Sequence, residues 1–455
     1  FSERELSQSA YRLAENVEFM GIFPMPTIGI DVNDIPSRKA SVTKLDIFFI
    51  CFSILTHIVD VGFDLNLAIR YLIDGEKAYF YWTIGFLFIP SFINIVISLR
   101  MYDQDCEMNA GSETAKHRGL ASRAVHNKAC WIFILVLQLA PVLRHIDSLK
   151  YALKARKCER DGDQVNQRRY YTRMLKEDQD IALLRVFECF LEAAPQQILQ
   201  LTIMLKNYHQ TFNLQLLHQV GSICSSLVSM GWAMASYNRS IRLAQWDKSN
   251  IGVVGTLLQF LWHFLITVSR IISISAVASI WVLYTGVYCA LHWISMTIWI
   301  LAEPSGAMEF CRDRRRAPHT PLTIRERIGS VMFASVLGVV YIFIYLNPTD
   351  GSTFFRHLLY YLLCFFENLI ACSLWAFVAT AEITERWYFE LLISLCIAPF
   401  AIGSLDQSTG FWTTISINSL SGATMTSCFL LRIRRKVRSL VGSKSRTTER
   451  ALSDS

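Results

Sequence analysis

Long runs of apolar residues dominate this chain and restrict what it can fold into. Eight runs are each long enough to cross about 30 Å of hydrocarbon as a helix. They lie near 46–73, 79–101, 181–205, 214–240, 251–274, 281–302, 327–346 and 356–380. Backbone polar groups inside lipid must be hydrogen-bonded within the segment or to protein, which favours helices. The sequence therefore predicts an all-α polytopic membrane helical bundle with eight transmembrane helices.

Basic residues are concentrated in alternate loops. Lys and Arg gather in 102–129, 149–180, 239–250, 304–327 and the tail, whereas 74–78, 206–213 and 347–356 hold only Lys77, Lys206 and Arg356. By the positive-inside rule, both termini are cytoplasmic. We divide the chain into an N-terminal tail (1–45), a transmembrane bundle (46–432) and a C-terminal tail (433–455). The net charge of +7 then reflects topology and does not indicate nucleic-acid binding.

Two further apolar segments are predicted to be re-entrant. The segment near 130–148 has basic loops on both flanks, so it must enter and leave by one face. Pro141, Arg144 and Asp147 interrupt it, as expected of a helix packed against protein. Residues 388–431, broken by Gly403 and Gly410, form the second such hairpin.

Two pairs of acidic residues lie inside apolar runs. Asp60 and Asp64 are in the first run, and Glu188 and Glu192 are in the third. A spacing of four stacks both carboxylates of a pair on one helix face. A charge at bilayer depth is costly unless it faces protein or water. We therefore expect the two pairs to face each other across a polar interior.

Other polar residues extend these stripes. Arg185 and Gln196 continue the ladder of the third run, and Pro195 inside it predicts a kink. Arg144 and Arg270 are buried basic groups that could answer the acids. Buried ion pairs often only fix helix packing. Two helix-long stripes exceed that need, so we interpret them as a polar pathway.

Sequence devices for catalysis and cofactor binding are absent. The chain has no Walker loop, dinucleotide fingerprint, EF-hand loop, HExxH or GxSxG motif. Its twelve Cys show no CxxC or Cys/His metal spacing. We predict no metal, no cofactor and no enzymatic activity, and interpret the chain as a passive transport protein.

The segment RVFECFLEAAPQQILQL at Arg185–Leu201 strongly resembles the signature of the XK-related (Kell blood group precursor-like) membrane proteins. Similar support comes from LTHIVDVGFDLNLAIRYL, QLAPVLRHID, SRIISISA and LLYYLLCFFENLIACSLW, and the resemblance covers roughly 45–435. It implies phospholipid scrambling, including phosphatidylserine exposure at the plasma membrane during apoptosis, by eight spans and two re-entrant helices. The lipid-pathway residues that it carries over are Asp46, Asp60, Asp64, Glu188 and Glu192, with Arg144 and Arg270 as basic rungs.

The resemblance also implies regulation by proteolysis of a cytoplasmic tail. DVND at Asp31–Asp34 has the D-x-x-D spacing that a caspase reads, although bulky Ile35 follows it, and a cut after Asp454 would release only Ser455. An orphan or phosphorylation-controlled member stays open as an alternative. The expected partners are phospholipids, a caspase, and either a single-span membrane protein or a second copy of the chain.

Two other functions compete with scrambling. A proton-coupled solute transporter would share protons among the buried carboxylates. The sequence shows no convincing internal repeat, which argues mildly against it. A non-transporting protein that docks another membrane protein would use the polar core only for packing.

Overall fold

The computed structural model describes residues 41–108, 131–136, 138–206, 214–244, 252–303, 307–313, 316, 320–346, 354–378 and 389–397. These residues form helices and no strands, so the all-α prediction is confirmed for them. The helices are α2 (Lys44–Ile73), α3 (Lys77–Met108), α5 (Trp131–Val136), α6 (Ala140–Asp161), α7 (Gln164–Glu188), a π-helical turn (Cys189–Ala193), α8 (Ala194–Lys206), α9 (Leu214–Ala244), α10 (Val253–Ile280), α11 (Val282–Ala302), α12 (Ala307–Cys311), α13 (Ile324–Val340) and α14 (Phe354–Val378). Residues 389–397 are also helical.

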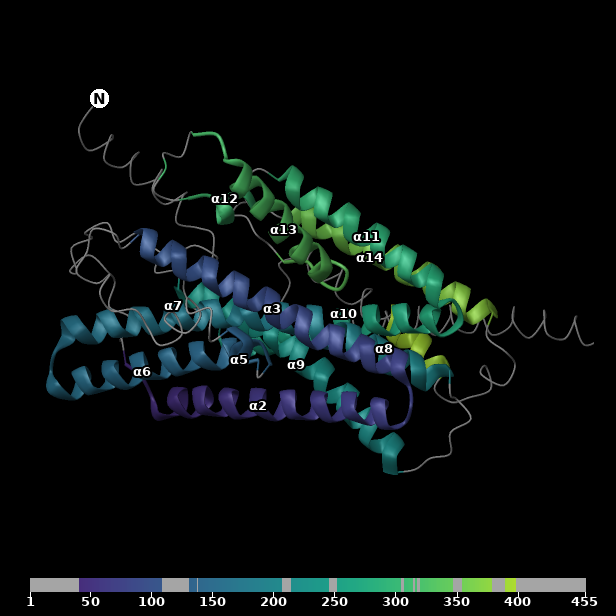
Figure 1. The fold of residues 1–455 in the computed structure, drawn as a ribbon, viewed down its shortest axis with the longest axis horizontal. Coiled ribbons are helices and arrows are strands. Elements are labelled where there is room, and N and C mark those ends of the chain that lie inside the picture. The colour runs from purple at the N-terminus through teal and green to yellow at the C-terminus, as the bar shows by residue number, and fades with distance from the viewer. Residues whose placement is uncertain are drawn as a thin grey trace, which may run out of the picture.

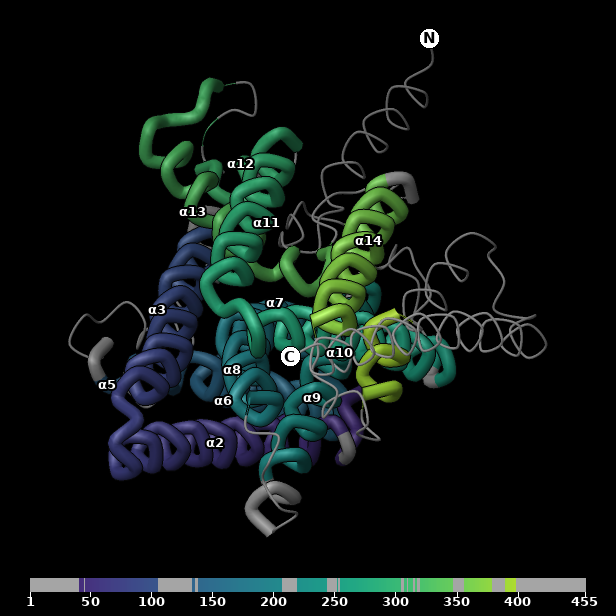
Figure 2. Tube along the Cα trace, turned by 90° about the vertical axis from the view of Figure 1, so that its right-hand side faces the viewer, coloured from purple at the N-terminus to yellow at the C-terminus, as the bar shows by residue number. Residues whose placement is uncertain are grey.

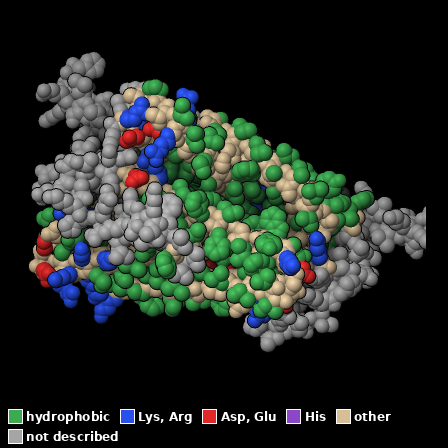
Figure 3. Space-filling model, in the orientation of Figure 1, with side chains coloured by type: hydrophobic (Ala, Val, Ile, Leu, Met, Phe, Trp, Pro, Cys, Tyr) green, Lys and Arg blue, Asp and Glu red, His purple; other side chains and the backbone are tan. Residues whose placement is uncertain are grey.

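The long helices have the length and surface of membrane-crossing helices. Five of those described, α2, α3, α10, α11 and α14, are long and apolar enough to cross a bilayer. Large apolar side chains are exposed along them, including Phe63, Tyr284 and Phe377. In Figure 3, charged side chains gather toward the two ends of the molecule and hydrophobic ones cover the band between them. In Figures 1 and 2, α2 and α14 lie on opposite sides of the bundle, with α8, α9 and α10 between them.

Local sequence signals explain where these helices begin and end. Thr43 caps α2 and forms a capping box with Asp46, whose carboxylate accepts hydrogen bonds from the Thr43 backbone and hydroxyl. Gly75, with φ of 79°, makes the tight turn into α3. The apolar stretch from 251 to 301 breaks at Trp281, as its length requires, and gives α10 and α11. Asp46 therefore acts as a helix cap in this structure.

Helices α5 and α6 form a helix–turn–helix that reverses at Gln138. This residue has φ of 49° and donates from its side chain to the carbonyl of Leu87, near the middle of α3. Before the turn, Ile134 packs on Ile95 of α3. After it, Arg144 reaches Ser98, so α6 returns along α3 in the direction from which α5 came. The segment near 130–148 therefore reverses its direction beside α3.

The predicted span 327–346 is wrong as a complete crossing. Helix α13 has only 17 residues, and Tyr341 at its end lies beside His292, in the middle of α11. Arg356 in the first turn of α14 contacts Glu303 at the end of α11, and Glu367 further along α14 contacts His292. Helix α14 is thus antiparallel to α11.

Helix α13 is antiparallel to α11 as well. Gly338 of α13 lies against Trp293 and Thr297 of α11, and Gly329 lies against Cys311, beyond the end of α11. Two successive helices that run in the same direction require a return of the chain between them. The segment 324–346 therefore dips into the bundle, and 356–380 runs in the direction opposite to the predicted one.

The predicted hairpin 388–431 is described only in part. Phe389 stacks on Trp375, and the backbone of Cys396 accepts from Ser269. The 389–397 helix therefore packs against α14 and α10. The rest of this segment lies outside the described residues.

The described helices repeat one arrangement twice, although no repeat is visible in the sequence. The first half consists of α2, α3, the chain reversal at Gln138 and α7–α8, in that order. The second half consists of α10, α11, the chain reversal at Tyr341 and α14. We call each of these two reversals a dip. Contacts such as Trp262 with Tyr361 and Arg270 with Asn368 show that α10 and α14 are parallel. In the first half, α2 contacts α7 through His57 and Glu188.

Candidate functional site: an acidic cluster between α2 and α7

The two acidic pairs predicted from sequence meet in one cluster. Charge interactions join Asp60 to Glu188, Asp64 to both Asp60 and Glu188, and Glu192 to the other three acids. His57 and Arg185 supply the positive charges. We call these six residues the acidic cluster. The expectation that the two stripes face each other therefore agrees with the geometry.

His57 connects three parts of the first half. Its Nδ1 lies 3.0 Å from Oε1 of Glu188 on α7, and its Nε2 lies 2.9 Å from the carbonyl oxygen of Gln138 at the dip. A carboxylate and a carbonyl both accept, so both ring nitrogens donate when His57 is an imidazolium beside ionised Glu188. His57 is buried, and its charge is therefore held by two fixed acceptors.

Carboxyl groups outnumber basic groups in the acidic cluster. Four carboxyl groups lie with one guanidinium and one imidazole ring, and Arg185 donates a further hydrogen bond, of 3.2 Å, to Ser229 of α9. Burial increases across the cluster, because Asp60 is exposed, Asp64 and Glu188 are half-buried, and Glu192 is buried. Asp60 thus lies at the exposed edge of the cluster, at the side of the bundle, whereas Glu192 lies at its buried end.

A π-helical turn shapes the inner wall of the cluster. Pro195 has no N–H to give to the carbonyl of Leu191, and its ring cannot fit a regular α-helical turn. The Ala194 N–H instead bonds back to Cys189, five residues earlier, and Glu192 lies within this widened turn. The kink predicted at Pro195 is therefore a local π-helical turn.

Two buried amides follow the π-helical turn. Nε2 of Gln196 and Oε1 of Gln197 have no hydrogen-bond partner among the described residues, although both side chains are buried. An unsatisfied buried polar atom costs about 1–3 kcal/mol. They extend the polar stripe along α8, beyond the acids.

Arg144 lies in a different site, where α6 meets α3 and α7. Its guanidinium pairs with Asp180 at 2.9 Å and with Glu177 at 3.2 Å, and it covers the ring of Tyr102. It is 1% exposed. Arg144 therefore forms ion pairs with two acids that the sequence analysis did not single out. Both acids lie on the part of α7 that precedes the apolar run.

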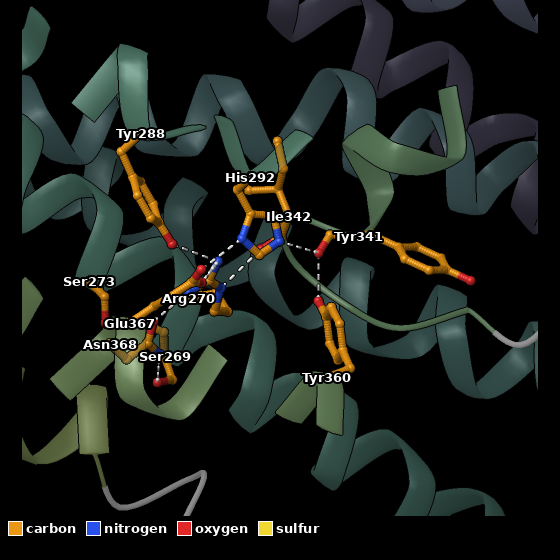
Figure 4. Close-up of polar contacts among 10 residues, drawn as sticks. All are labelled: Ser269, Arg270, Ser273, Tyr288, His292, Tyr341, Ile342, Tyr360, Glu367 and Asn368. Atoms are coloured by element: carbon orange, nitrogen blue, oxygen red, sulfur yellow. Dashed lines mark hydrogen bonds and ion pairs between the residues drawn. The ribbon is translucent and has the colours of Figure 1, made fainter. Parts of the chain in front are cut away.

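Arg270 is the centre of a second buried polar site, which Figure 4 shows and which we call the Arg270 network. Its Nε donates to the carbonyl of Ile342 at 2.9 Å, and its Nη1 donates to Asn368 at 2.8 Å. Its Nη2 lies 3.1 Å from Glu367. His292 joins the other oxygen of Glu367 to the carbonyl of Tyr341.

Every element of the second half contributes to the Arg270 network. Tyr360 of α14 also donates to the carbonyl of Tyr341, at 2.7 Å, and Asn368 donates to Ser269 of α10. One guanidinium faces one carboxylate directly, and Arg270 is fully buried. The network bonds the irregular backbone after α13 to the surrounding helices, as membrane-embedded backbone requires.

Sequence reasoning grouped the acids correctly but not their bases. Asp60, Asp64, Arg185, Glu188 and Glu192 come together, and Gln196 follows them. Arg144 and Arg270, predicted as basic rungs, lie outside the acidic cluster, because each pairs with other acids. The sequence did not indicate Gln138 as a site residue. It contacts His57 through its backbone carbonyl, and any residue type has this group.

Some predicted sites cannot be placed. Asp31, Asp34 and Asp454 lie outside the described residues. Within the part of the chain that the structure describes, no three His, Cys, Asp or Glu side chains form a group that could hold a metal ion. The described cysteines form no disulfide.

Comparisons with known proteins identify the family of this chain. The sequence model of the XK-related protein family matches residues 48–406. The chain is similar to Cell death abnormality protein 8 of Caenorhabditis elegans, with 26% identity over 340 residues, which are 72% of this chain and 70% of that protein. The protein of the same name from Caenorhabditis briggsae is 25% identical over 71% of this chain and 69% of its own length. The chain therefore belongs to the XK-related family of membrane proteins.

Proposed function

We propose that this protein is a passive phospholipid scramblase and that lipid headgroups pass along the acidic cluster. The observation that carries the proposal is the convergence of four carboxylates from α2 and α7–α8 on one site that opens at exposed Asp60. The names of the two relatives, which refer to cell death, support a role in dying cells. Phosphatidylserine exposure at the plasma membrane is the form of scrambling that we propose.

The chemistry of a headgroup fits the charge of the cluster. Crossing hydrocarbon costs a headgroup its hydration, and this cost must be offset by polar groups along the way. The carboxylates can accept hydrogen bonds from an ammonium group, while Arg185 can donate to a phosphate. The acyl chains can stay in lipid, because the cluster opens sideways at Asp60. No energy source is needed for such an exchange.

We propose the following topology for this function. Helices α2, α3, α7–α8, α9, α10, α11 and α14, together with the segment that starts at 389, cross the membrane. The dips at Gln138 and Tyr341 enter from the cytoplasmic side. Both termini are then cytoplasmic, which keeps eight crossings and two re-entrant segments but exchanges the roles of 327–346 and the segment after 388.

The central experiment is reconstitution in liposomes that contain a fluorescent lipid. The intact chain and a form cut after Asp34 are compared by dithionite bleaching of the lipid in the outer leaflet. We expect bleaching beyond the half that protein-free liposomes show, and more of it after the cut. Bleaching of neither form beyond the protein-free level would contradict the proposal.

A variant pair assigns the transport to the cluster. Replacing Asp60→Asn together with Asp64→Asn removes two carboxyl groups from the open side of the cluster. A hydrogen bond to a charged group is worth about 1.5–3 kcal/mol, so we expect the scrambling rate to fall by about ten-fold or more. Glu76→Gln, which neutralises an exposed acid in the turn before α3, is the matched control and should scramble normally.

Proton-coupled solute transport is the second candidate, because the His57–Glu188 contact holds a proton between two titratable groups. It predicts uptake of a soluble substrate that requires a pH gradient. If the first proposal holds, the extent of bleaching is the same with and without a pH gradient across the liposomes. Solute uptake that requires the gradient, with bleaching no greater than the protein-free half, would favour the second.

A further inference from the structure

Helices α6 and α7 form a long antiparallel hairpin with a basic outer part. The hairpin extends past the start of α2 in Figure 1 and turns at Gly162, which has φ of 76°. Between residues 150 and 173 it carries eight Lys or Arg against three acids, Glu159, Asp161 and Asp163. Basic side chains are visible at this end of the molecule in Figure 3.

Three basic side chains of this outer part are available for a partner. Lys157, Arg160 and Arg169 are exposed and form no ion pair with any described residue. Lys154 and Arg173 lie over the rings of Tyr170 and Tyr151. Leu153 and Val165 are 50% and 66% exposed on the same hairpin. This surface combines unpaired positive charge with apolar contacts.

The inner part of the hairpin has the opposite character. Glu177 and Asp180 hold Arg144, Ser148 donates to Asp178, and Asp147 pairs with Lys150. Acids therefore gather where the hairpin joins the bundle, and bases gather toward its tip. Any segment that binds along it must carry its charges in the reverse order.

The N-terminal segment of the same chain has that order of charge. Residues 1–35 contain six acids and two bases, and Arg38 and Lys39 follow. The acids are Glu3, Glu5, Glu15, Glu18, Asp31 and Asp34. Reading away from α2, bases come first and acids follow, which matches the acids and bases of the hairpin.

The structure places Val42, which follows this segment in the sequence, on the hairpin. Val42 is 5% exposed and packs in a cluster with Ala152 and Ala155 of α6 and Met174 of α7. The eight residues from Asp34 to Val42 can extend over about 27 Å, whereas the part of α6 from Ala152 to its end is about 14 Å long. The acidic residues are thus tethered within reach of the basic tip, where a short linker keeps their effective concentration high.

From this geometry we propose that the outer part of the α6–α7 hairpin is the docking surface for the acidic N-terminal segment, residues 1–35, of the same chain. Complementary charges hold the segment along the hairpin, and Leu153 and Val165 give it apolar contact. The proposal does not depend on lipid transport. A second copy, an anionic lipid and an acidic partner protein are the other occupants that this surface could have.

Site-specific photo-crosslinking of the full chain tests this contact. Benzoylphenylalanine replaces Leu153 or, separately, Val165, and the protein is studied in discs of zwitterionic lipid. Ile324, 78% exposed at the start of α13, is the control position. We expect mass spectrometry to find crosslinks from both hairpin positions to residues 1–35 of the same chain and none from the control. A mixture of isotope-labelled and unlabelled protein separates crosslinks within one chain from those between copies.

A charge exchange tests the reason for the contact. Lys157→Glu with Arg160→Glu should lower the crosslinking yield about three- to ten-fold. Each exposed ion pair is weak, but the new Glu side chains would also repel the acids of residues 1–35. Adding Glu15→Lys and Glu18→Lys should restore it. Raising the salt to 1 M, where the screening length falls to about 3 Å, should also lower the yield. Crosslinks to lipid or to a second copy, equal yield at Ile324, or a yield unaffected by charge reversal would overturn the proposal.

Discussion

In the first half of the bundle, the base that joins the dip to an acid is His57, whereas in the second half it is Arg270. Each donates to a backbone carbonyl at the dip, of Gln138 or Ile342, and each contacts one Glu, Glu188 or Glu367. The surroundings differ. Three further carboxylates and an exposed side surround the His57 contact, whereas Tyr, Asn and His side chains enclose the Arg270 contact.

The same helix arrangement can therefore support two different roles, one structural and one in transport. A guanidinium that bonds a carbonyl, an amide and a carboxylate from two other segments of the chain fixes helices in place. A His ring among four carboxyl groups leaves acceptor oxygens that a passing ammonium group can use. We therefore interpret the second half as the rigid support and the first half as the working side, and four measurements can break or sharpen this comparison.

The largest expected effect is at Arg270. Arg270→Met leaves Glu367 buried without its guanidinium, and removing one partner of a buried ion pair typically costs about 3–5 kcal/mol. We expect a marked fall in the melting temperature of the purified protein, measured by loss of the monodisperse peak after heating. The double variant with Glu367→Met should recover much of the loss. A single variant as stable as the parent would contradict the support role.

His57 should matter less for stability. His57→Ala removes the contacts to Glu188 and Gln138, and hydrogen bonds to charged groups are worth about 1.5–3 kcal/mol. The half-buried Glu188 keeps Arg185 nearby, so the loss should stay below that of Arg270→Met in the same heating assay. Equal losses at both positions would mean that the two halves are equally rigid.

The packing of the second dip gives the next smaller effect. A Cβ added at Gly338 would collide with Thr297 and Trp293 of α11, so Gly338→Ala should cost about 1–3 kcal/mol. At Gly329 the nearest atom, Sγ of Cys311, lies 3.5 Å from such a Cβ. Gly329→Ala is therefore the matched control and should unfold like the parent. Similar melting of the two variants would argue against a tightly packed dip.

The smallest effect concerns the hairpin, a long feature of the first half. Burial raises the pKa of Asp178 to about 6, the charge of Asp46 adds to this, and the Ser148 hydrogen bond opposes it. The folded state therefore binds the proton more tightly than the unfolded state, and stability falls as the pH rises from about 4 to about 6. With partial exposure taken into account, we expect about 1–2 kcal/mol. Asp178→Asn should abolish this slope in melting curves measured across the pH range.

The sequence indicated the helices well because apolar runs and charged loops are local signals. It indicated the first dip because Arg144 and Asp147 interrupt the run. The second dip was missed for a physical reason, since the returning residues Tyr341–Leu346 are themselves apolar and buried, so hydropathy continues through the reversal. The carbonyls that turn outward there are bonded by Arg270, His292 and Tyr360, which come from distant parts of the chain.

The acidic cluster was predictable for a related reason. Each pair of acids stands out against the apolar neighbours of its own segment, and the spacing of four places both members on one helix face. Their bases could not be assigned, because a pairing such as His57 with Glu188 depends on which helices are adjacent. Helix order in space follows from packing, and the sequence carries no local sign of it.

The backbone after α13 has a consequence for how the protein is made. The carbonyls of Tyr341 and Ile342 are bonded by side chains of α10, α11 and α14, and α14 leaves the ribosome after them. The dip therefore lacks part of its bonding while it is being synthesised. We expect it to wait at the membrane surface or in the insertion machinery until α14 arrives, which makes this half dependent on the order of biogenesis.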